Sequence, residues 1–153
     1  MRWTQWFFRL CATIASKSKD PATKVGCVIV AEDQSIVSAG YNGFPRGVQD
    51  DAFFVPARYE RPEKYVWTEH AERNAIYAAA KRVLQGSSMY LTWYPCADCA
   101  RAIIQSGITD VYIDKVNYRE EDEAKYPQFR FDAARQMLAE AGVRVHVMDI
   151  GAK

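Results

Sequence analysis

The sequence predicts a layered α/β fold in which most strands are parallel, and three observations carry this prediction. Segments with helical periodicity alternate with short apolar segments, in the order helix, strand, strand, helix, strand, helix, strand, helix, strand. A short connection joins the first two strands, which makes them an antiparallel hairpin. A long connection that contains a helix joins the last two strands, so we expect these two strands to be parallel.

The first elements are marked by their hydrophobic spacing. Apolar residues recur at helical spacing over residues 2–17, and Pro21 stops this helix because proline disfavours helical conformation in the residue before it. A continuous β-branched run predicts a strand at 25–30, and a second strand follows at 35–41. Residues 42–66 are rich in glycine and proline, so we expect a long irregular loop that its aromatic residues keep ordered.

The remaining elements follow this loop, and each is bounded by a proline, a glycine or a change of periodicity. We expect a helix at 70–84, a strand at 89–93, a helix at 96–106, a strand at 110–114, a helix at 131–141 and a strand at 143–148.

Composition bounds the class of protein. The chain has 153 residues, which fits one domain spanning residues 1–153. Hydrophobic residues make up 49% of the chain and the net charge is only +1, which excludes a wholly disordered chain and disfavours a nucleic-acid-binding protein. We find no segment of membrane-spanning length and no signal-peptide pattern at the N-terminus, so we expect a cytoplasmic protein without a membrane partner.

Two short motifs carry the chemistry. His70 begins one expected helix and Cys96 begins another, with Cys99 one turn further along the same helix face. One imidazole and two thiolates supply three zinc ligands and leave the fourth tetrahedral position for water, which is typical of a catalytic zinc site. Glu72 lies in the first turn after His70, where it can face that water without binding the metal.

Other uses of these cysteines are weaker. A Cys-x-x-Cys motif alone also fits a redox pair or half of a structural zinc site. A redox pair leaves His70 and Glu72 unexplained, and a closed structural site requires a fourth ligand. Cys11 and Cys27 lie on apolar segments, where we expect them to be buried small hydrophobic residues.

The two motifs together resemble the zinc nucleobase deaminases, in which a histidine and two cysteines hold the metal and a glutamate transfers protons. Further segments narrow the resemblance to the deoxycytidylate deaminases. The matching segments follow in order at residues 18–21, 25–30, 40–47, 70–76, 95–100 and 105–108.

The resemblance implies a three-layer α/β/α sandwich with a five-stranded mixed sheet. It implies Zn²⁺ on His70, Cys96 and Cys99, and hydrolysis of dCMP to dUMP and ammonia with Glu72 as the catalytic proton shuttle. Asn42 matches a residue that contacts the sugar. The resemblance also implies a homo-oligomer, often a hexamer, with dCTP and dTTP as possible effectors.

The remaining substrate contacts rest on weaker patterns. Arg46 is our first choice for the phosphate because it follows Asn42 closely, although Arg58, Arg61 and Lys64 lie in the same loop and any of them also fits a solvated surface charge. Further candidates for the substrate are Ala71, beside the zinc ligand; Tyr94, whose ring either stacks on the base or fills the core; and Tyr118, by position.

Three classes of function stay open at this point. A nucleotide deaminase is favoured, including one for 5-substituted cytosine nucleotides. A deaminase of bases in RNA or single-stranded DNA is disfavoured by the near-neutral charge. A noncatalytic zinc module leaves Glu72 unexplained. Exposed aromatic surface is expected at Trp3, Trp6, Phe7, Phe53 and Phe54, and favours a homo-oligomer.

Overall fold

The computed structural model describes residues 1–150, and its centre is one five-stranded sheet. The strand order is β2-β1-β3-β4-β5. Strand β1 pairs antiparallel with both β2 and β3, whereas β3, β4 and β5 are parallel, which confirms the mixed sheet and the parallel last pair. The strands are β1 (Gly26–Val30), β2 (Ile36–Tyr41), β3 (Ser88–Leu91), β4 (Asp110–Asp114) and β5 (Arg144–Met148).

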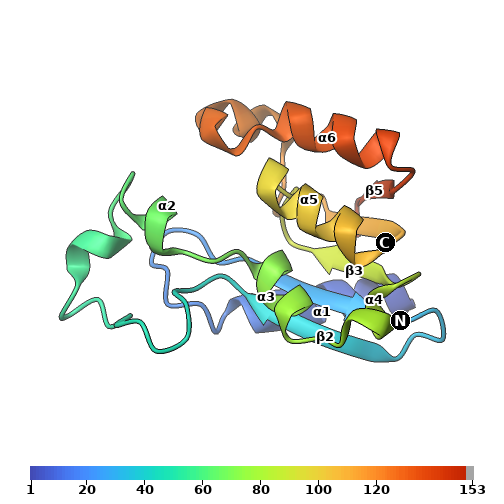
Figure 1. The fold of residues 1–153 in the computed structure, drawn as a ribbon, viewed down its shortest axis with the longest axis horizontal. Helices are drawn as coiled ribbons and strands as arrows, with labels where there is room; N and C mark the ends of the chain where they lie inside the picture. Colours follow the sequence, from blue (N-terminus) through green and yellow to red (C-terminus); the bar gives the residue numbers. More distant parts are fainter. Residues whose placement is uncertain (151–153) are drawn as a thin grey trace.

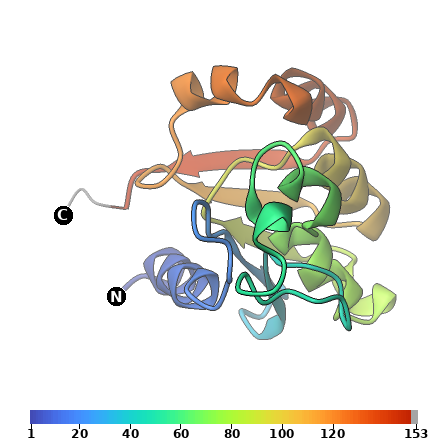
Figure 2. The same ribbon diagram turned by 90° about the vertical axis from the view of Figure 1, so that its left-hand side faces the viewer.

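Helices cover both faces of the sheet, which confirms the expected three layers (Figures 1 and 2). Helix α1 (Trp3–Ala15) packs on one face, mainly against β1. The other face carries α3 (Ala71–Tyr77), α5 (Ala97–Ser106) and α6 (Phe131–Glu140).

Two glycines let helices approach the sheet on opposite faces. A Cβ atom on Gly26 would lie 1.9 Å from the carbonyl oxygen of Cys11 in α1. A Cβ atom on Gly40 would lie 2.5 Å from the carbonyl oxygen of Ala71, at the start of α3. Both strand positions therefore need glycine, and the second one brings the beginning of α3 directly onto the sheet.

The alanine-rich helix expected at 70–84 is broken. The structure has α3 (Ala71–Tyr77) and then the short α4 (Lys81–Leu84), with Ala80 in an extended conformation between them. Leu84 is buried in the same core as Ala75. In a continuous helix these two residues would lie on opposite sides, because each residue turns the helix by about 100°. Burial of Leu84 therefore overrides the helix propensity of the alanines.

Helix α1 is amphipathic as expected, but one part of the prediction is wrong. Phe7 is fully buried and packs against Tyr90, so it adds nothing to the exposed surface. Trp3 and Trp6 remain 57% and 37% exposed. Cys11 is buried as predicted, and so is Cys27 in β1. Within residues 1–150, none of the helices has the length and apolar character needed to cross a membrane.

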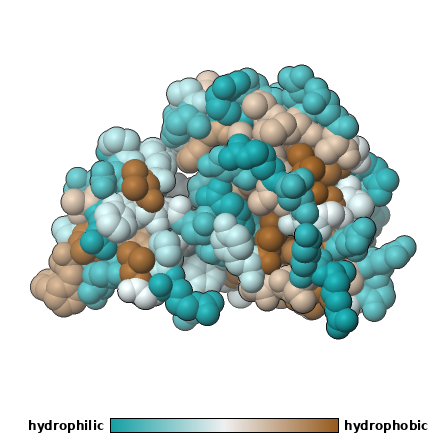
Figure 3. All heavy atoms as spheres, in the orientation of Figure 1, coloured by the Kyte–Doolittle hydropathy of each residue, from teal (hydrophilic) through white to brown (hydrophobic). Residues whose placement is uncertain are grey.

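The loop expected at 42–66 is ordered and stands out from the body of the molecule (Figures 1 and 3). It contains the 3₁₀ helix η1 (Pro56–Tyr59) and leads into the short helix α2 (Lys64–Trp67). Its Phe53 and Phe54 are exposed, as predicted. A buried ion pair joins α2 to the loop before β1, with the Lys64 Nζ atom 3.0 Å from the Asp20 carboxylate.

Candidate zinc-dependent active site

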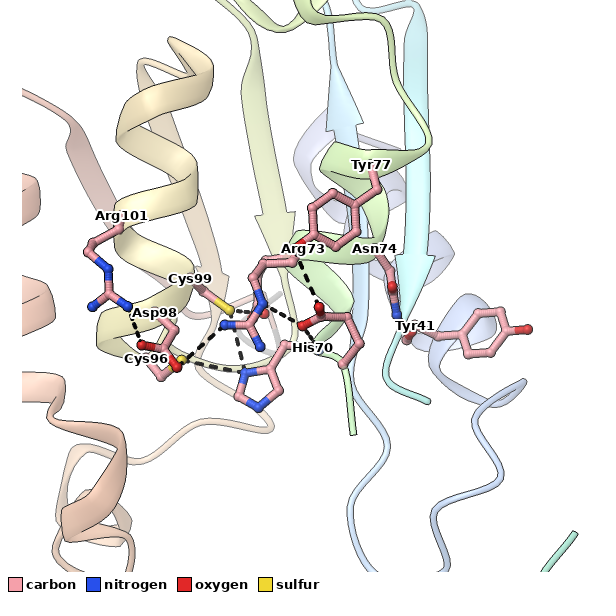
Figure 4. Close-up of polar contacts among 11 residues, drawn as sticks. Tyr41, His70, Arg73, Asn74, Tyr77, Cys96, Asp98, Cys99 and Arg101 are labelled. Atoms are coloured by element: carbon pink, nitrogen blue, oxygen red, sulfur yellow. Dashed lines mark hydrogen bonds and ion pairs between the residues drawn. The ribbon is translucent and has the colours of Figure 1, made fainter. Parts of the chain in front are cut away.

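The expected metal ligands come together because two helices begin beside each other. His70 is the N-cap residue of α3 and Cys96 is the N-cap residue of α5, and both have extended backbones. Cys99 lies in the first turn of α5. The helices α3 and α5 pack against each other on one face of the sheet, and their beginnings meet near the beginning of β1 and the end of β3 (Figure 4). Helix N-termini favour negative charge, which suits thiolate ligands.

The distances fit a tetrahedral zinc ion. The Nδ1 atom of His70 lies 3.5 Å from the Sγ atom of Cys96 and 3.4 Å from the Sγ atom of Cys99. All three donor atoms lie within 4.8 Å of one another. Zinc bonds of ordinary length in tetrahedral geometry separate nitrogen and sulfur ligands by about 3.6 Å. One histidine and two cysteines can therefore hold the ion, and a fourth position is left for water.

The site also favours the ionised form of one cysteine. The hydrogen bond from Cys99 lowers the pKa of the Cys96 thiol to about 4, assisted by His70, although burial opposes this shift. Burial also raises the pKa of the Glu72 carboxyl group, which is only 3% exposed. Its Oε2 atom accepts a hydrogen bond from the Cys99 thiol, at 2.9 Å. Because a metal-bound cysteine has lost its proton, Cys99 would no longer donate this hydrogen bond to Glu72 with zinc in place.

A cavity of about 460 Å³ opens onto these groups, which is the size expected for a small-molecule site. His70, Glu72 and Cys96 are among the residues that line it. Among the expected substrate contacts, Asn42, Ala71 and Tyr94 also line it, whereas Arg46 and Tyr118 do not.

Comparisons with known proteins agree with this geometry. The family model of the cytidine and deoxycytidylate deaminase zinc-binding region matches residues 1–115. The chain belongs to this family. The uncharacterized deaminase of the luxG 3′ region of Aliivibrio fischeri is 41% identical over 144 residues, which cover 94% of this chain and 92% of that protein.

Two further relatives carry a more specific name. Human deoxycytidylate deaminase is 37% identical over 136 residues, covering 88% of this chain and 76% of the human protein. The structure of a dCMP deaminase from the cyanophage S-TIM5 has a TM-score of 0.69 and 25% identity, and the match covers 95% of this chain and 96% of that one. Zinc is therefore the cofactor of this deaminase, and its expected ligands are the three donors already described.

In this deaminase, the Asn42 side chain bonds to the backbone of the segment before β1, which also lines the cavity. Its Oδ1 atom accepts the backbone N–H of Val25, and its Nδ2 atom donates to the carbonyl oxygen of Thr23, both at 2.8 Å. An amide group offers two donor hydrogens and two acceptor lone pairs. One donor and one acceptor site therefore stay available to a substrate hydroxyl group.

The aromatic residues before Cys96 differ from the prediction in one respect. A strand to residue 93 would direct Trp93 and Tyr94 to opposite faces, so that only one could face the site. Strand β3 ends at Leu91, and both side chains line the cavity. Tyr118 lies behind Tyr94, with ring centroids 5.6 Å apart, and its hydroxyl group donates to Glu123 and accepts from Arg135.

The loop cations divide into two groups. Arg61 and Lys64 line the cavity, whereas Arg46 is exposed and lies outside its lining. Arg58 stacks over the ring of Trp67, with its Cζ atom 3.9 Å from the ring centroid. Lys64 is buried and engaged by Asp20, whereas Arg61 is exposed, so Arg61 is the more accessible of the two loop cations that line the cavity.

Sequence reasoning missed the aromatic wall opposite the loop. Tyr126, Phe129 and Phe131 line the cavity, although they lie far along the chain from the zinc motifs. The ring of Phe129 meets His70 edge to face with centroids 5.6 Å apart, and it meets Tyr65 of α2 at 5.4 Å. Helical spacing marks Phe131 as the start of the last expected helix, but no motif or spacing marks Tyr126 or Phe129, because their role depends on how the segment before α6 folds back over the site.

Proposed function

We propose that this deaminase converts dCMP and water to dUMP and ammonia. The observation that carries the proposal is the buried Glu72 carboxyl group beside three zinc-binding donors at a nucleotide-sized cavity. A purely structural zinc site has no use for such a carboxyl group. The deoxycytidylate deaminases among the relatives support dCMP as the substrate.

The residues of the chain have separate tasks in this reaction. Zinc, when bound, supplies the nucleophile by lowering the pKa of a water. Glu72 accepts a proton from that water, delivers one to the ring nitrogen of cytosine, and transfers another to the amino group that leaves as ammonia. Burial suits these transfers, since a raised pKa brings the carboxyl group closer to neutral pH.

Tyr94, Trp93 and Phe129 surround the space beside these groups with aromatic surface, which suits a flat pyrimidine ring. Ala71 is fully buried at the first position of α3, where backbone N–H groups have no partner within the helix. We assign the base to this aromatic space and the sugar to the free sites of Asn42.

We assign the 5′-phosphate to Arg61. This side chain lines the cavity, its Nη2 atom lies 3.3 Å from the Thr23 hydroxyl oxygen, and its guanidinium lies over the ring of Tyr126 at 5.4 Å. It therefore links two separate segments of the cavity lining, and its planar donors match phosphate oxygens. Arg46, the first candidate from the sequence, is the alternative residue for the phosphate contact.

Ammonia release from matched substrates tests this function. We expect dCMP to be turned over far better than deoxycytidine, which has no phosphate for Arg61, and better than a deoxycytidine-containing oligonucleotide, whose 5′-phosphate is a diester with further nucleotides attached. Equal kcat/KM values for dCMP and deoxycytidine would contradict the phosphate assignment. A preference for the oligonucleotide would favour a base-editing enzyme instead.

We also propose a homo-oligomer, with a hexamer favoured by the family resemblance. Support comes from the exposed aromatic side chains of Trp3 and Phe53, which are 57% and 85% exposed. A monomer by light scattering at micromolar concentration would refute it.

Activation by dCTP and inhibition by dTTP rest on the resemblance alone, and kinetic assays with each nucleotide test them.

The proposed compartment is the cytoplasm. All four cysteines are free thiols, and Cys96 and Cys99 must stay reduced to bind zinc. Fractionation of the producing cells tests this assignment.

A further inference from the structure

Tyr94 lies between the catalytic cavity and a second cavity of the molecule. The second cavity has a volume of about 680 Å³, and Tyr94 contributes to the lining of both. The residue is only 5% exposed. Contacts that Tyr94 receives from the second cavity therefore determine how its ring is presented to the catalytic one.

Arg135 of α6 contacts Tyr94 from the second cavity. Its Cζ atom lies 4.6 Å from the centroid of the Tyr94 ring. Arg135 lines the second cavity and is not among the residues that line the catalytic cavity. A guanidinium within about 6 Å of a ring centroid is attracted by the negative charge of the aromatic face. A cation therefore holds the Tyr94 ring from the side of the second cavity.

Two neighbours fix the guanidinium in this place. An Nη atom of Arg135 donates to the Tyr118 hydroxyl group at 2.9 Å and forms an ion pair with Glu123. The Tyr118 hydroxyl group in turn donates to Glu123, and its ring lies 5.6 Å from that of Tyr94. Tyr118 is buried, and so is most of the Glu123 side chain. Arg135, Tyr118 and Glu123 thus form one network behind Tyr94, which we call the Tyr94 clamp.

The hydrogen bonds of the Tyr94 clamp do not depend on pH near neutrality. Burial opposes the charge of Arg135, but its hydrogen bond to Glu123 outweighs burial and raises the pKa of the guanidinium. Burial and the hydrogen bond to Glu123 also raise the pKa of the Tyr118 hydroxyl group, which therefore keeps its proton and continues to donate it. The Tyr94 ring consequently faces a permanent cation.

A simpler role for Arg135 is to join α6 to the 3₁₀ helix η2 (Glu120–Lys125), which contains Glu123. The Arg135 side chain is partly exposed, as is common for an arginine that only links two elements. The two roles differ in one respect. A link between α6 and η2 does not require the aromatic ring of Tyr94, whereas a role in presenting that ring to the substrate does.

We propose that Arg135 is a positioning residue for substrate binding, because its guanidinium holds the Tyr94 ring in the orientation that receives the pyrimidine base. The proposal rests on the proposed function, which assigns the base to the aromatic space beside Tyr94. A ring that is already fixed loses less conformational freedom when a ligand binds to it. Arg135 therefore acts on the affinity for the nucleotide, whereas Glu72 acts on the chemical step.

Steady-state kinetics of the zinc enzyme with dCMP, combined with a double-mutant cycle, test this proposal. Arg135→Met keeps the apolar stem and removes the charge. We expect KM to rise about three- to tenfold, as for loss of one partly exposed cation–π contact, while kcat changes less than about twofold. Arg135→Lys, which keeps a cation near the ring, should recover most of this loss.

The cycle asks whether the effect depends on the Tyr94 ring. In a Tyr94→Leu background, Arg135→Met should raise KM no further, because no ring is left to hold. In a Tyr94→Phe background, which keeps the ring and replaces the side chain most conservatively, Arg135→Met should raise KM as in the unchanged enzyme. Urea denaturation checks that each variant is folded.

Arg119→Met is the matched control. Arg119 lines the same second cavity but is exposed, so we expect KM to stay unchanged when this equal charge is removed. An unchanged KM in Arg135→Met would overturn the proposal, and so would an undiminished rise of KM in the Tyr94→Leu background. Turnover of dCMP by the unchanged enzyme decides the proposed function by itself, so failure of the proposed function is distinct from failure of this proposal.

Discussion

Two regions of very different construction meet at the cavity. The inner region consists of the first turns of α3 and α5, where caps of regular helices carry His70 and Cys96. The outer region is the segment 42–67, which lines the cavity with Asn42, Arg61 and Lys64 and is tied to the loop before β1 by the Lys64–Asp20 ion pair. The proposed function assigns the proton transfers to the inner region and the sugar and phosphate contacts to the outer one, so we expect changes in the two regions to affect different measurements.

The largest effect is expected in the inner region, at Glu72. Glu72→Gln keeps the size of the side chain but removes its ability to accept protons. General acid–base catalysis contributes about 10²–10⁴-fold, so we expect kcat to fall by at least about a hundredfold. Metal analysis should still find one zinc ion per chain, since Glu72 is not a ligand. Activity within about tenfold of the unchanged enzyme would remove Glu72 from its role.

The inner region is also the part that sequence alone could predict. His70 and Glu72 lie two residues apart, and Cys96 and Cys99 three apart, so local helix geometry is enough to direct them to one point. The prediction needed only that two helices begin beside each other. The structure supplies that condition, because β1 and β3 are neighbours in the sheet and α3 packs against α5.

The outer region could be predicted only as a set of candidates. Proximity along the chain to Asn42 favoured Arg46, yet Arg61 and Lys64 line the cavity. The path of the loop depends on residues far away in sequence, since Asp20 engages Lys64 across 44 positions. Phe129 could not be predicted for the same reason, because it reaches the site from the segment before α6, far along the chain from the zinc ligands. Spacing rules describe regular elements and give no path for a long loop.

Breaking the Asp20–Lys64 pair should sharpen the contrast between the regions. Both side chains are 6% exposed, and removing one partner of a buried ion pair leaves an uncompensated charge. We expect Asp20→Asn to lower the free energy of unfolding by about 3–5 kcal/mol, measured by urea denaturation. The KM for dCMP should rise, because the displaced loop no longer holds the nucleotide.

Asp50→Asn is the matched control for this change. Asp50 pairs with Lys19 at 2.9 Å, but the side chains are 40% and 62% exposed. Solvent screening limits such a surface pair to less than about 1 kcal/mol. Equal losses of stability in the two variants would show that the buried pair does not fix the loop, and the outer region would then need another anchor.

The smallest expected effect separates the two phosphate candidates within the outer region. A hydrogen bond to a charged group contributes about 1.5–3 kcal/mol, so loss of the phosphate contact in Arg61→Ala should lower kcat/KM for dCMP roughly tenfold to a hundredfold. Deoxycytidine has no phosphate, and its kcat/KM should stay the same in this variant. Arg46 lies outside the cavity lining, so the loss for Arg46→Ala should be much smaller. A larger loss of kcat/KM in Arg46→Ala than in Arg61→Ala would mean that the loop closes further over the bound nucleotide. Proximity along the chain to Asn42 would then identify the phosphate contact better than the cavity lining does.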